Sequence, residues 1–293
     1  MRGLAAAYHA RGPMSESDVA LSVFEDVGLG LARAGSNGYG WAKAPHVMMV
    51  CWLAEDVHAM GRFQRRSVQK SLRSAASLCV FSRNQVRVLQ ATLSIDPKRI
   101  VVVPFGVDTR YFDPANVVGP AGGHGVVAVG SDSRRDYETL FEAASMVDAP
   151  FTVACEPRNV QSLNAPPNVS VVNMYDDAYR RLLHRADIVV TPTKAPAYPS
   201  GQTVVLEAMS MGKATITTDS QAMRDYVFDG ETGILVSQRD PQQLAARINR
   251  LLDDAQLRES VGSAAQARAR AQFSQAHMWS AVADVLRSVT RDE

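Results

Sequence analysis

The sequence contains 293 residues, of which 46% are hydrophobic and 21% charged, and its net charge at pH 7 is +1. These values are typical of a globular protein, and the near-zero charge gives no electrostatic indication of nucleic-acid binding. The length favours two domains. Three scattered cysteines predict neither a disulfide framework nor a metal site, and without a transmembrane run or an apolar leader we expect a cytoplasmic protein.

The first part of the chain alternates short apolar runs with helical patterns. Buried strands are predicted over residues 19–24, 46–52, 78–81 and 100–103, and helices over residues 27–33, 60–74 and 84–93. This alternation is typical of a parallel sheet covered by helices. Gly28 and Gly30 lie in the first helix, but the third glycine of a dinucleotide fingerprint is missing, so we expect no dinucleotide site there.

The helix predicted over residues 60–74 carries five basic residues and no acidic one. Arg62, Arg66, Lys70 and Arg73 follow helical spacing and therefore share one face, with Arg65 beside it. One interpretation is an ordinary solvated face. The other is contact with an anionic membrane surface or an acidic acceptor.

Residues 114–125 are rich in proline and glycine and are predicted to form a linker. A second series of alternating elements follows it. Strands are predicted over residues 126–129, 151–154, 169–172, 187–192, 214–219 and 234–236. Helices are predicted over residues 137–146, 179–185 and 273–289. A further helix is predicted to begin after Asp240, which caps it, with Gln243 completing a capping box.

The stretch from Tyr198 to Lys213, YPSGQTVVLEAMSMGK, joins two of these strands. It begins with turn-forming residues, continues into helix-forming ones and ends at Gly212, a glycine in the position that terminates helices. The free N–H groups at such a helix start favour an anion, most often a phosphate. The alternative is a tight turn without a ligand.

Four motifs occur in a characteristic order: PFGVD (104–108), AYRRLLHRADIVVTPT (178–193), GQTVVLEAMSMGKATITTD (201–219) and DGETGILV (229–236). Together they resemble the GT-B fold glycosyltransferases of the retaining group 1 type, the GT4 family. The resemblance covers nearly the whole second half of the chain. It implies an α/β protein with two Rossmann-like doubly wound domains, of which the N-terminal one is truncated.

The resemblance also implies a domain plan. Residues 1–113 form a partial N-terminal acceptor-side domain, residues 114–125 a linker and residues 126–272 a nucleotide-sugar-binding domain. Residues 273–293 form a C-terminal helix that packs back on the N-terminal domain. Family members open with a strand and a glycine-rich loop that precede the segment at residues 19–33, and this opening is missing here.

The residues implied to bind the donor lie in the second half. Glu207, in the LEA motif, holds the ribose hydroxyls, because a carboxylate accepts two hydrogen bonds from a diol. The backbone amides of Thr203 and Val204 hold the diphosphate. Met174 and Tyr175 lie where the family's base-binding loop lies.

Basic residues are implied to assist at the diphosphate. Arg135, with its neighbour Arg134, follows the first strand of the second domain, and Lys194 is a weaker candidate of the same kind. Positive charges there stabilise the negative charge that develops on the leaving group. The alternative for both arginines is a solvated turn.

Two positions depart from the family pattern on the donor side. Pro199 replaces a glutamate that contacts the sugar, and Ser131 replaces an arginine. The neighbouring Ser200 and Gln202 are predicted to contribute hydrogen bonds to the sugar but no charge, and Gly201 between them is a further donor-binding candidate.

The first half has a third departure. Cys51 occupies the place of a family histidine, with His58 as a nearby substitute, and both are weak candidates for catalysis. No residue is assigned as catalytic base.

The expected function is transfer of a sugar from a UDP- or GDP-sugar to a hydroxyl acceptor, such as a glycan, a lipid or a small molecule, with retention. We expect no metal, because no Asp-x-Asp motif or His/Cys cluster occurs, no cofactor beyond the nucleotide sugar, and no nucleic-acid partner. Peripheral contact with the inner face of the membrane through the 60–74 helix is a further possibility. The alternatives are a non-catalytic or partner-dependent homologue, and an epimerase or phosphorylase of the same architecture.

Overall fold

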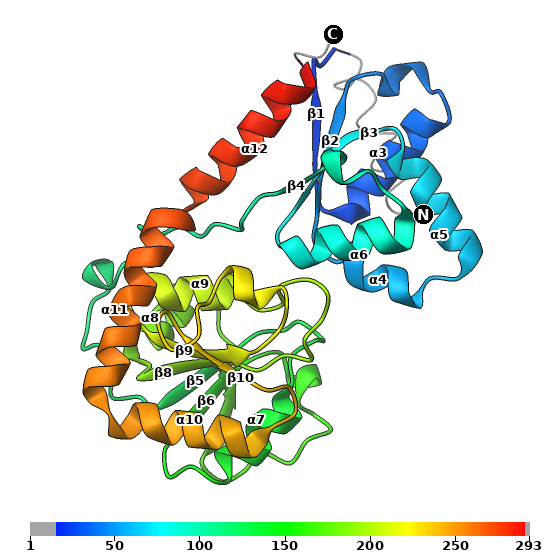
Figure 1. The fold of residues 1–293 in the computed structure, drawn as a ribbon. Coiled ribbons are helices and arrows are strands. Elements are labelled where there is room, and N and C mark those ends of the chain that lie inside the picture. The colour runs from blue at the N-terminus through cyan, green and yellow to red at the C-terminus, as the bar shows by residue number, and fades with distance from the viewer. Residues whose placement is uncertain (1–15, 291–293) are drawn as a thin grey trace. The chain divides into compact units, whose positions relative to one another are not determined.

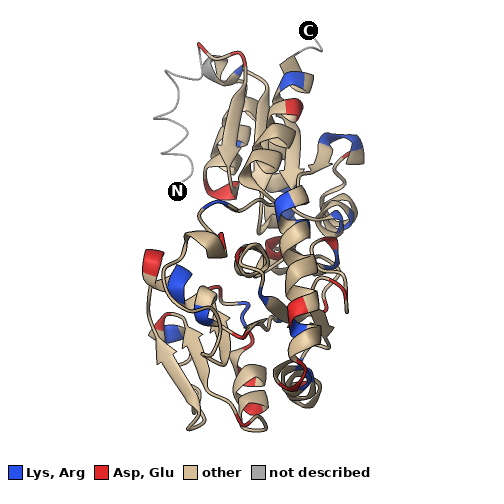
Figure 2. Ribbon diagram, turned by 90° about the vertical axis from the view of Figure 1, so that its left-hand side faces the viewer, with Lys and Arg blue, Asp and Glu red and all other residues tan. Residues whose placement is uncertain are grey.

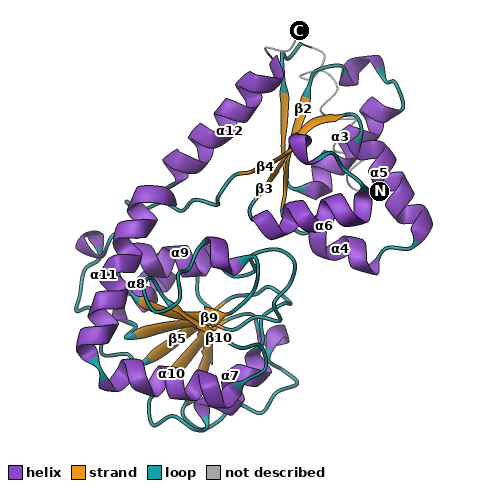
Figure 3. Cartoon of the chain, in the orientation of Figure 1, coloured by secondary structure: helices purple, strands orange, loops and turns teal. Residues whose placement is uncertain are grey.

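The computed structural model describes residues 16–290, which divide into two compact units. The first unit comprises residues 16–104 and 278–290, and the second comprises Phe105–His277. Each unit contains a parallel sheet with helices on both faces (Figures 1 and 3). The α/β prediction with two parallel sheets is therefore confirmed.

The sheet of the first unit has four parallel strands in the order β1-β2-β3-β4. The strands are β1 (Ala20–Val23), β2 (His46–Val50), β3 (Ala75–Val80) and β4 (Ile100–Val102). All five residues of β2 are buried, as expected for a central strand covered on both faces. Among the described residues the strands follow the order of the sequence without a reversal.

Five helices belong wholly or partly to the first unit. They are α3 (Glu25–Ser36), α4 (Leu53–Ala59), α5 (Arg62–Leu72), α6 (Arg83–Leu93) and α12 (Gln275–Thr290), of which α12 crosses into this unit at Met278. Helix α3 packs against α5, and α4 against α6.

The strand predicted over residues 46–52 ends at Val50, because residues 53–59 form the unpredicted helix α4. This seven-residue helix is too short to be stable alone and depends on the burial of Leu53, Ala54 and Val57.

The sheet of the second unit has six parallel strands in the order β10-β9-β8-β5-β6-β7. They are β5 (Val126–Val129), β6 (Phe151–Ala154), β7 (Val169–Val172), β8 (Ile188–Thr191), β9 (Ala214–Thr218) and β10 (Ile234–Val236). The chain runs outward from β5 in one direction and from β8 in the other. The strand order therefore reverses between β5 and β8, and in such sheets ligands bind where the carboxyl ends of these two strands diverge.

Helices cover both faces of this sheet. They are α7 (Tyr137–Ala144), α8 (Asp176–Arg185), α9 (Gln202–Ser210), α10 (Pro241–Asp253) and α11 (Ala255–Gln272). α7 and α10 share one buried cluster with Val126, Phe151 and Ile188, while α8 and α9 share another with Val127 and Val189. Positive and negative residues are interspersed along the ribbon of both units (Figure 2).

Helix α11 was not predicted, because its buried face consists of small residues rather than large apolar ones. Val261, Gly262, Ala265 and Ala269 form that face. A Cβ atom on Gly262 would lie 2.3 Å from the carbonyl oxygen of Gly212, so glycine allows α11 to approach the end of α9.

Five short 3₁₀ segments complete the described chain: η1 (Gly40–Ala42), η2 (Pro97–Arg99), η3 (Pro114–Asn116), η4 (Pro157–Asn159) and η5 (Met223–Asp225). η3 lies in the predicted linker, which belongs to the second unit, where Phe112 and Val117 are buried beside α8 and α9. Between residues 16 and 290, no helix is long and apolar enough to cross a bilayer.

Helix α10 begins as predicted, with one difference. The Asp240 carboxylate caps it by accepting a hydrogen bond from the Gln243 amide (2.8 Å), and Pro241 is its first residue. The side chain of Gln243, however, accepts from the Ser237 amide (2.5 Å) rather than from the capping residue. The capping box is therefore replaced by a bond that fixes the turn after β10.

Candidate functional site

A cavity of about 280 Å³ lies at the carboxyl edge of the second unit's sheet. The residues that line it follow β5, β6 and β7 or belong to α8 and α9. They include Gly130, Ser131, Cys155, Asn173, Met174, Tyr175, Asp176, Tyr179, Val204 and Glu207. Four predicted donor-binding residues, Met174, Tyr175, Val204 and Glu207, are therefore brought together although they are up to 33 residues apart in the sequence.

Glu207 lies in the middle of α9, with Tyr179 of α8 beside it. The Tyr179 hydroxyl donates a hydrogen bond to Oε2 of Glu207. Burial raises the pKa of Glu207 to about 7, although the tyrosine bond opposes this rise. Burial and the nearby Glu207 charge raise the pKa of Tyr179 well above its ordinary value, so Tyr179 remains a donor at neutral pH.

Glu207 retains acceptor capacity for a ligand. A carboxylate has about four lone-pair positions, and the tyrosine uses one of them. Sequence reasoning missed Tyr179, because nothing in the local pattern of α8 indicates that this side chain reaches a residue 28 positions away. Phe112 packs edge-on against the Tyr179 ring at 6.1 Å between ring centroids and helps to hold it.

The predicted base-binding residues border the opening of this cavity. Tyr175 is 63% exposed and directly precedes α8, whereas Met174 is partly buried against the α8–α9 cluster. Asp176, the first residue of α8, has φ of +54°, a conformation that is rare outside glycine. The chain therefore turns sharply between the two residues and the helix that carries Tyr179.

Arg135 is buried rather than part of a solvated turn. Its Nε donates to the carbonyl of Val129 (3.1 Å), and its Nη1 donates to Oγ of Ser200 (3.0 Å). The guanidinium thus joins the end of β5 to the loop before α9. A Cβ on Gly130 would lie 2.2 Å from Nε, so the glycine makes room for this arginine.

The other two basic candidates lie beside Arg135 on paired backbone segments. The Lys194 amide donates to the Arg134 carbonyl (2.8 Å), and Arg135 and Thr193 form an isolated bridge. The Lys194 side chain is exposed, and Arg134 is partly buried. The structure therefore places Arg134, Arg135 and Lys194 near one another at the switch point of the sheet.

Asp132 organises the same loop and was not predicted. Its carboxylate accepts hydrogen bonds from Oγ of Ser200 (2.7 Å), from the Tyr198 hydroxyl (2.7 Å) and from the Arg134 amide (2.9 Å). Burial acts to raise the pKa of Asp132, but these bonds and the Arg135 charge outweigh it and lower the pKa below its ordinary value. Asp132 therefore stays ionised and holds the loop that leads into α9.

Helix α9 begins without a side-chain cap. Its N-cap residue is Gly201 with φ of +86°, where a Cβ would lie 2.4 Å from Thr191 and 2.9 Å from Arg135. Gln202 is buried, and its Oε1 has no hydrogen-bond partner among the described residues. Thr203 is exposed and Val204 lines the cavity. The first turn of α9 thus presents backbone amides and a positive dipole end near a buried arginine.

The two weak catalytic candidates lie in the first unit. Cys51 is buried directly after β2, whereas His58 is exposed in the last turn of α4. One is enclosed and the other is solvated, so they do not form a single surface site. Within residues 16–290, no group of three or more His, Cys, Asp or Glu side chains is placed to hold a metal ion.

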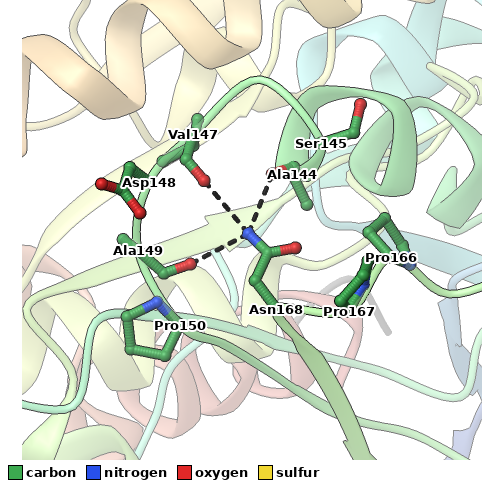
Figure 4. Close-up of a pocket in the computed structure, with 9 residues that line it drawn as sticks. All are labelled: Ala144, Ser145, Val147, Asp148, Ala149, Pro150, Pro166, Pro167 and Asn168. Atoms are coloured by element: carbon green, nitrogen blue, oxygen red, sulfur yellow. Dashed lines mark hydrogen bonds between the residues drawn. The ribbon is translucent and has the colours of Figure 1, made fainter.

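A larger cavity, of about 520 Å³, opens at the opposite edge of the same sheet (Figure 4). The Asn168 amide nitrogen shapes it by donating to the carbonyls of Ala144, Ala149 and Val147 at 2.9, 3.0 and 3.1 Å. Its other lining residues include Pro150, Pro166 and Pro167, and Asp148 is its one ionisable residue. This cavity is larger than the first, but its lining offers only one ionisable side chain, so it is the weaker candidate for a reactive site.

A family model described as "Glycosyl transferases group 1" matches residues 123–254. The similarity to this family therefore lies within the second unit, Phe105–His277. The match includes the cavity residues from Val129 to Glu207 and the loop around Asp132.

The curated proteins that the chain resembles include a glycosyltransferase and a synthase. The chain is 29% identical over 117 residues to the capsular polysaccharide biosynthesis glycosyltransferase CapM of Staphylococcus aureus, which covers 40% of this chain and 30% of that protein. It is 25% identical over 278 residues to the alpha-maltose-1-phosphate synthase of Mycolicibacterium smegmatis, which covers 82% of this chain and 70% of that protein. The match to the first of these thus spans about a third of the relative's length.

Solved structures share the fold of both units. HepE of Anabaena in complex with UDP superposes with a TM-score of 0.78 at 16% identity, over 96% of this chain and 82% of HepE. Sucrose-phosphate synthase of Thermosynechococcus elongatus gives a TM-score of 0.80 at 19% identity, over 98% of this chain and 76% of that protein. The predicted GT-B fold, with two Rossmann-like domains, is therefore confirmed.

Proposed function

We propose that this protein is a retaining, metal-independent glycosyltransferase of the GT4 family. It transfers a sugar from a UDP- or GDP-sugar to a hydroxyl acceptor. The observation that carries the proposal is the position of Glu207, a largely buried carboxylate that borders a cavity at the switch point beside the uncapped start of α9. A matching family model and a structural neighbour solved with UDP support it.

In this proposal each side of the cavity binds one part of the nucleotide sugar. Glu207 accepts hydrogen bonds from the ribose hydroxyls, and Tyr175 and Met174 flank the base. The amides of Thr203 and Val204 bind the diphosphate. Ser200, Gly201 and Gln202 lie where the sugar follows the diphosphate, and the unpartnered Oε1 of buried Gln202 is an acceptor for a sugar hydroxyl.

The chemical contribution of these groups is stabilisation of the leaving diphosphate. As the bond to the sugar breaks, negative charge accumulates on the diphosphate oxygens. Arg134, Arg135 and Lys194 supply positive charge, and the α9 dipole adds a partial positive charge at its first turn. Because Arg135 is already fixed by Val129 and Ser200, little reorganisation is needed during the reaction.

Isothermal titration calorimetry with UDP and GDP tests the proposal. We expect one of the two nucleotides to bind, and Glu207→Ala to weaken binding by about 100-fold, because two hydrogen bonds to a charged acceptor are lost. Glu138→Ala, which removes an exposed acid of α7, is the matched control and should leave binding unchanged. If neither nucleotide binds the wild-type protein, the nucleotide-sugar proposal is wrong.

Product analysis tests the proposed retention of anomeric configuration and the proposed metal independence. Incubation with UDP- or GDP-sugars and hydroxyl acceptors, with and without EDTA, should give a glycoside whose anomeric configuration is that of the donor. Loss of activity in EDTA would refute metal independence. An inverted product would refute retention.

A binding role without turnover is the second candidate. The loop before α9 carries Pro199 and no acidic residue of its own, while the Asp132 carboxylate, which contacts this loop, is engaged by Ser200 and Tyr198. Nucleotide binding without any transfer or hydrolysis would favour this non-catalytic or partner-dependent role. Conversion of the nucleotide sugar into an isomer, without an acceptor, would instead identify an epimerase.

We also propose a cytoplasmic location with peripheral membrane contact through α5. Phe63 is 86% exposed, and the basic residues Arg62, Arg66 and Lys70 around it are exposed as well. An exposed aromatic ring within a basic helix face is suited to an anionic lipid surface. Phe63→Ser should reduce flotation with anionic vesicles, whereas Val118→Ser, at an equally exposed apolar site (93%), should not. Equal recovery with neutral and anionic vesicles would exclude this contact.

A further inference from the structure

Aromatic residues follow three neighbouring strands of the first unit's sheet. Phe24 comes directly after β1, Phe81 directly after β3, and Trp52 two residues after β2. The Phe24 ring lies 5.2 Å from that of Trp52 and 6.4 Å from that of Phe81, measured between centroids. Because the three strands are parallel neighbours (Figure 1), these rings gather at one carboxyl edge of the sheet.

The cluster is only partly enclosed. Phe81 is 1% exposed and forms the floor, whereas Trp52 is 39% exposed. Val23 and Val27, on either side of Phe24 in the sequence, are 45% and 37% exposed. A single exposed apolar residue is normal on a protein surface, but here an exposed indole packs against a second ring, with the two ring planes at 50°, among other exposed apolar residues.

Phe24 adopts a strained backbone conformation to reach Trp52. Its φ of +67° and ψ of 164° lie in a region that residues with bulky side chains rarely occupy. Strain of this kind persists only where the surroundings enforce it, and it concentrates at functional sites. The position of the Phe24 ring is therefore maintained against a local backbone preference.

The turn that carries Trp52 is held from both sides. On one side the Glu25 carboxylate, 7% exposed, accepts from the Leu53 amide (2.6 Å). On the other side the fully buried Gln85 donates to the carbonyls of Cys51 (2.8 Å) and Val50 (3.2 Å) and accepts from the Phe81 amide (3.0 Å). The indole is thus presented by a rigid turn, which reduces the entropy lost when a ligand stacks on it.

Charge selects the kind of ligand. Three of the described helices begin at this edge, and two of them carry acidic residues in their first turns, Glu25 and Asp26 in α3 and Glu55 and Asp56 in α4. The third helix, α6, begins with Arg83 and has no acidic residue in its first turn. The four acidic residues outnumber this arginine and disfavour an anionic ligand, whereas the hydroxyl groups of a neutral ligand can donate hydrogen bonds to carboxylate oxygens. A flat apolar face combined with hydroxyl groups is the surface of an uncharged sugar ring.

We propose that Trp52 and Phe24 form a stacking platform for an uncharged sugar ring at the carboxyl edge of the first sheet, and that this ring belongs to the acceptor. The word "acceptor" rests on the proposed transferase function, but binding of the sugar ring to the platform does not. Trp52 makes the contact, Phe24 and Glu25 are positioning residues, and the acceptor class is a neutral glycan or glycoside.

Fluorescence of Trp52 tests the platform without any nucleotide. In a variant in which the other two of the three tryptophans are replaced by phenylalanine, Trp52 is the reporter. Methyl glucoside, methyl mannoside and maltose are the probes, with glucuronate as the anionic counterpart and neutral phosphatidylcholine vesicles as the lipid alternative. We expect a saturable change with at least one neutral sugar and a weaker one with glucuronate. A response to vesicles alone, or to no sugar at all, overturns the proposal.

Substitutions then separate the platform from the donor site. Trp52→Ala should weaken binding of the responding sugar by about tenfold or more, as measured by NMR titration, and Trp52→Phe should restore most of it. Trp279→Ala, which removes another half-exposed indole (44%), is the matched control. UDP and GDP affinity should be unchanged in all three variants. Sugar binding that survives Trp52→Ala refutes the platform, whereas absence of nucleotide binding in every variant refutes the donor site and leaves the platform standing.

Discussion

The carboxyl edges of the two sheets each contain a buried glutamate, and burial raises the pKa of both. Glu25 in the first unit is bound by a backbone amide, that of Leu53, and its Oε2 is enclosed without a partner among the described residues. Glu207 in the second unit is bound by a side chain, Tyr179, and borders a cavity. The same residue type under the same burial therefore fixes a turn in one unit and faces a ligand space in the other.

The neighbours of each glutamate explain this difference. Beside Glu207 lie a buried arginine and a helix start without a cap, which together favour an anion. Beside Glu25 lie aromatic rings and further acidic residues, which favour an uncharged ligand. A raised carboxylate pKa alone thus does not identify a nucleotide site, and the groups around the carboxylate decide which ligand it can serve.

The largest effect is expected at Arg135. Arg135→Ala removes the bonds to Val129 and Ser200 and leaves Asp132 without its nearest buried positive charge. We expect a loss of about 2–4 kcal/mol in the free energy of unfolding, measured by urea denaturation. Arg134→Ala, at the partly buried neighbour, is the control and should lose less than half as much. Equal losses would mean that the buried guanidinium does not organise the second edge.

At the first edge, two substitutions of Glu25 should differ. Glu25→Gln keeps an oxygen that accepts from the Leu53 amide, whereas Glu25→Leu leaves that amide unpaired. We expect the leucine variant to lose about 1–3 kcal/mol of stability, and the glutamine variant much less. Thermal unfolding of both measures the difference. Similar melting temperatures would show that the amide bond contributes little to the Trp52 turn.

The pKa of Glu207 predicts a pH-dependent stability difference. Its pKa is raised from 4.5 to about 7, so the folded state binds the proton more tightly and wild-type stability falls as the pH rises through this range. Glu207→Gln removes this penalty and should be more stable than the wild type by about 1–3 kcal/mol at pH values above 7. The two proteins should converge below pH 4.5, where the wild-type carboxyl is protonated in both states. A constant difference at all pH values would contradict the assignment.

The smallest effect is expected at Tyr179. Tyr179→Phe removes the hydrogen bond that lowers the pKa of Glu207, so that pKa should rise further. In the proposed site the ribose hydroxyls bind an ionised carboxylate more strongly than a protonated one, so nucleotide affinity near neutral pH should fall by about three- to tenfold and recover at higher pH. Calorimetry over a pH series measures this shift. Tyr137→Phe, which removes a hydroxyl that donates to the Gly130 carbonyl, serves as a control for loss of a buried tyrosine hydroxyl.

The framework of both units was predictable, because buried parallel strands read as continuous apolar runs and the covering helices as periodic ones. The strands at His46–Val50 and Ile188–Thr191 are examples. Two helices were not predicted, for different reasons. Helix α4 is too short for its periodicity to be visible, and α11 buries small residues where a search for large apolar side chains finds no pattern.

The candidate site was predictable where a residue lies on a recognisable linear motif. Glu207 and the uncapped start of α9 belong to one contiguous stretch. Tyr179 and Asp132 were missed because their roles depend on hydrogen bonds to Glu207 and Ser200, which are 28 and 68 residues away in the sequence. The aromatic cluster was missed for the same reason, since its members come from three separate strands and one of them depends on a positive φ.

The glycine contact between α11 and the end of α9 has a mechanical consequence for the proposed site. Behind α9, the Gly212 carbonyl lies against Gly262, and the Ser210 carbonyl accepts from the Gln266 side chain (2.9 Å). The helix is therefore held at its far end and cannot shift along its axis when an anion binds at its first turn. The loop before the first turn is held as well, by the bonds of Asp132 and Arg135 to Ser200, so the proposed site selects a bound group whose size matches a preformed space.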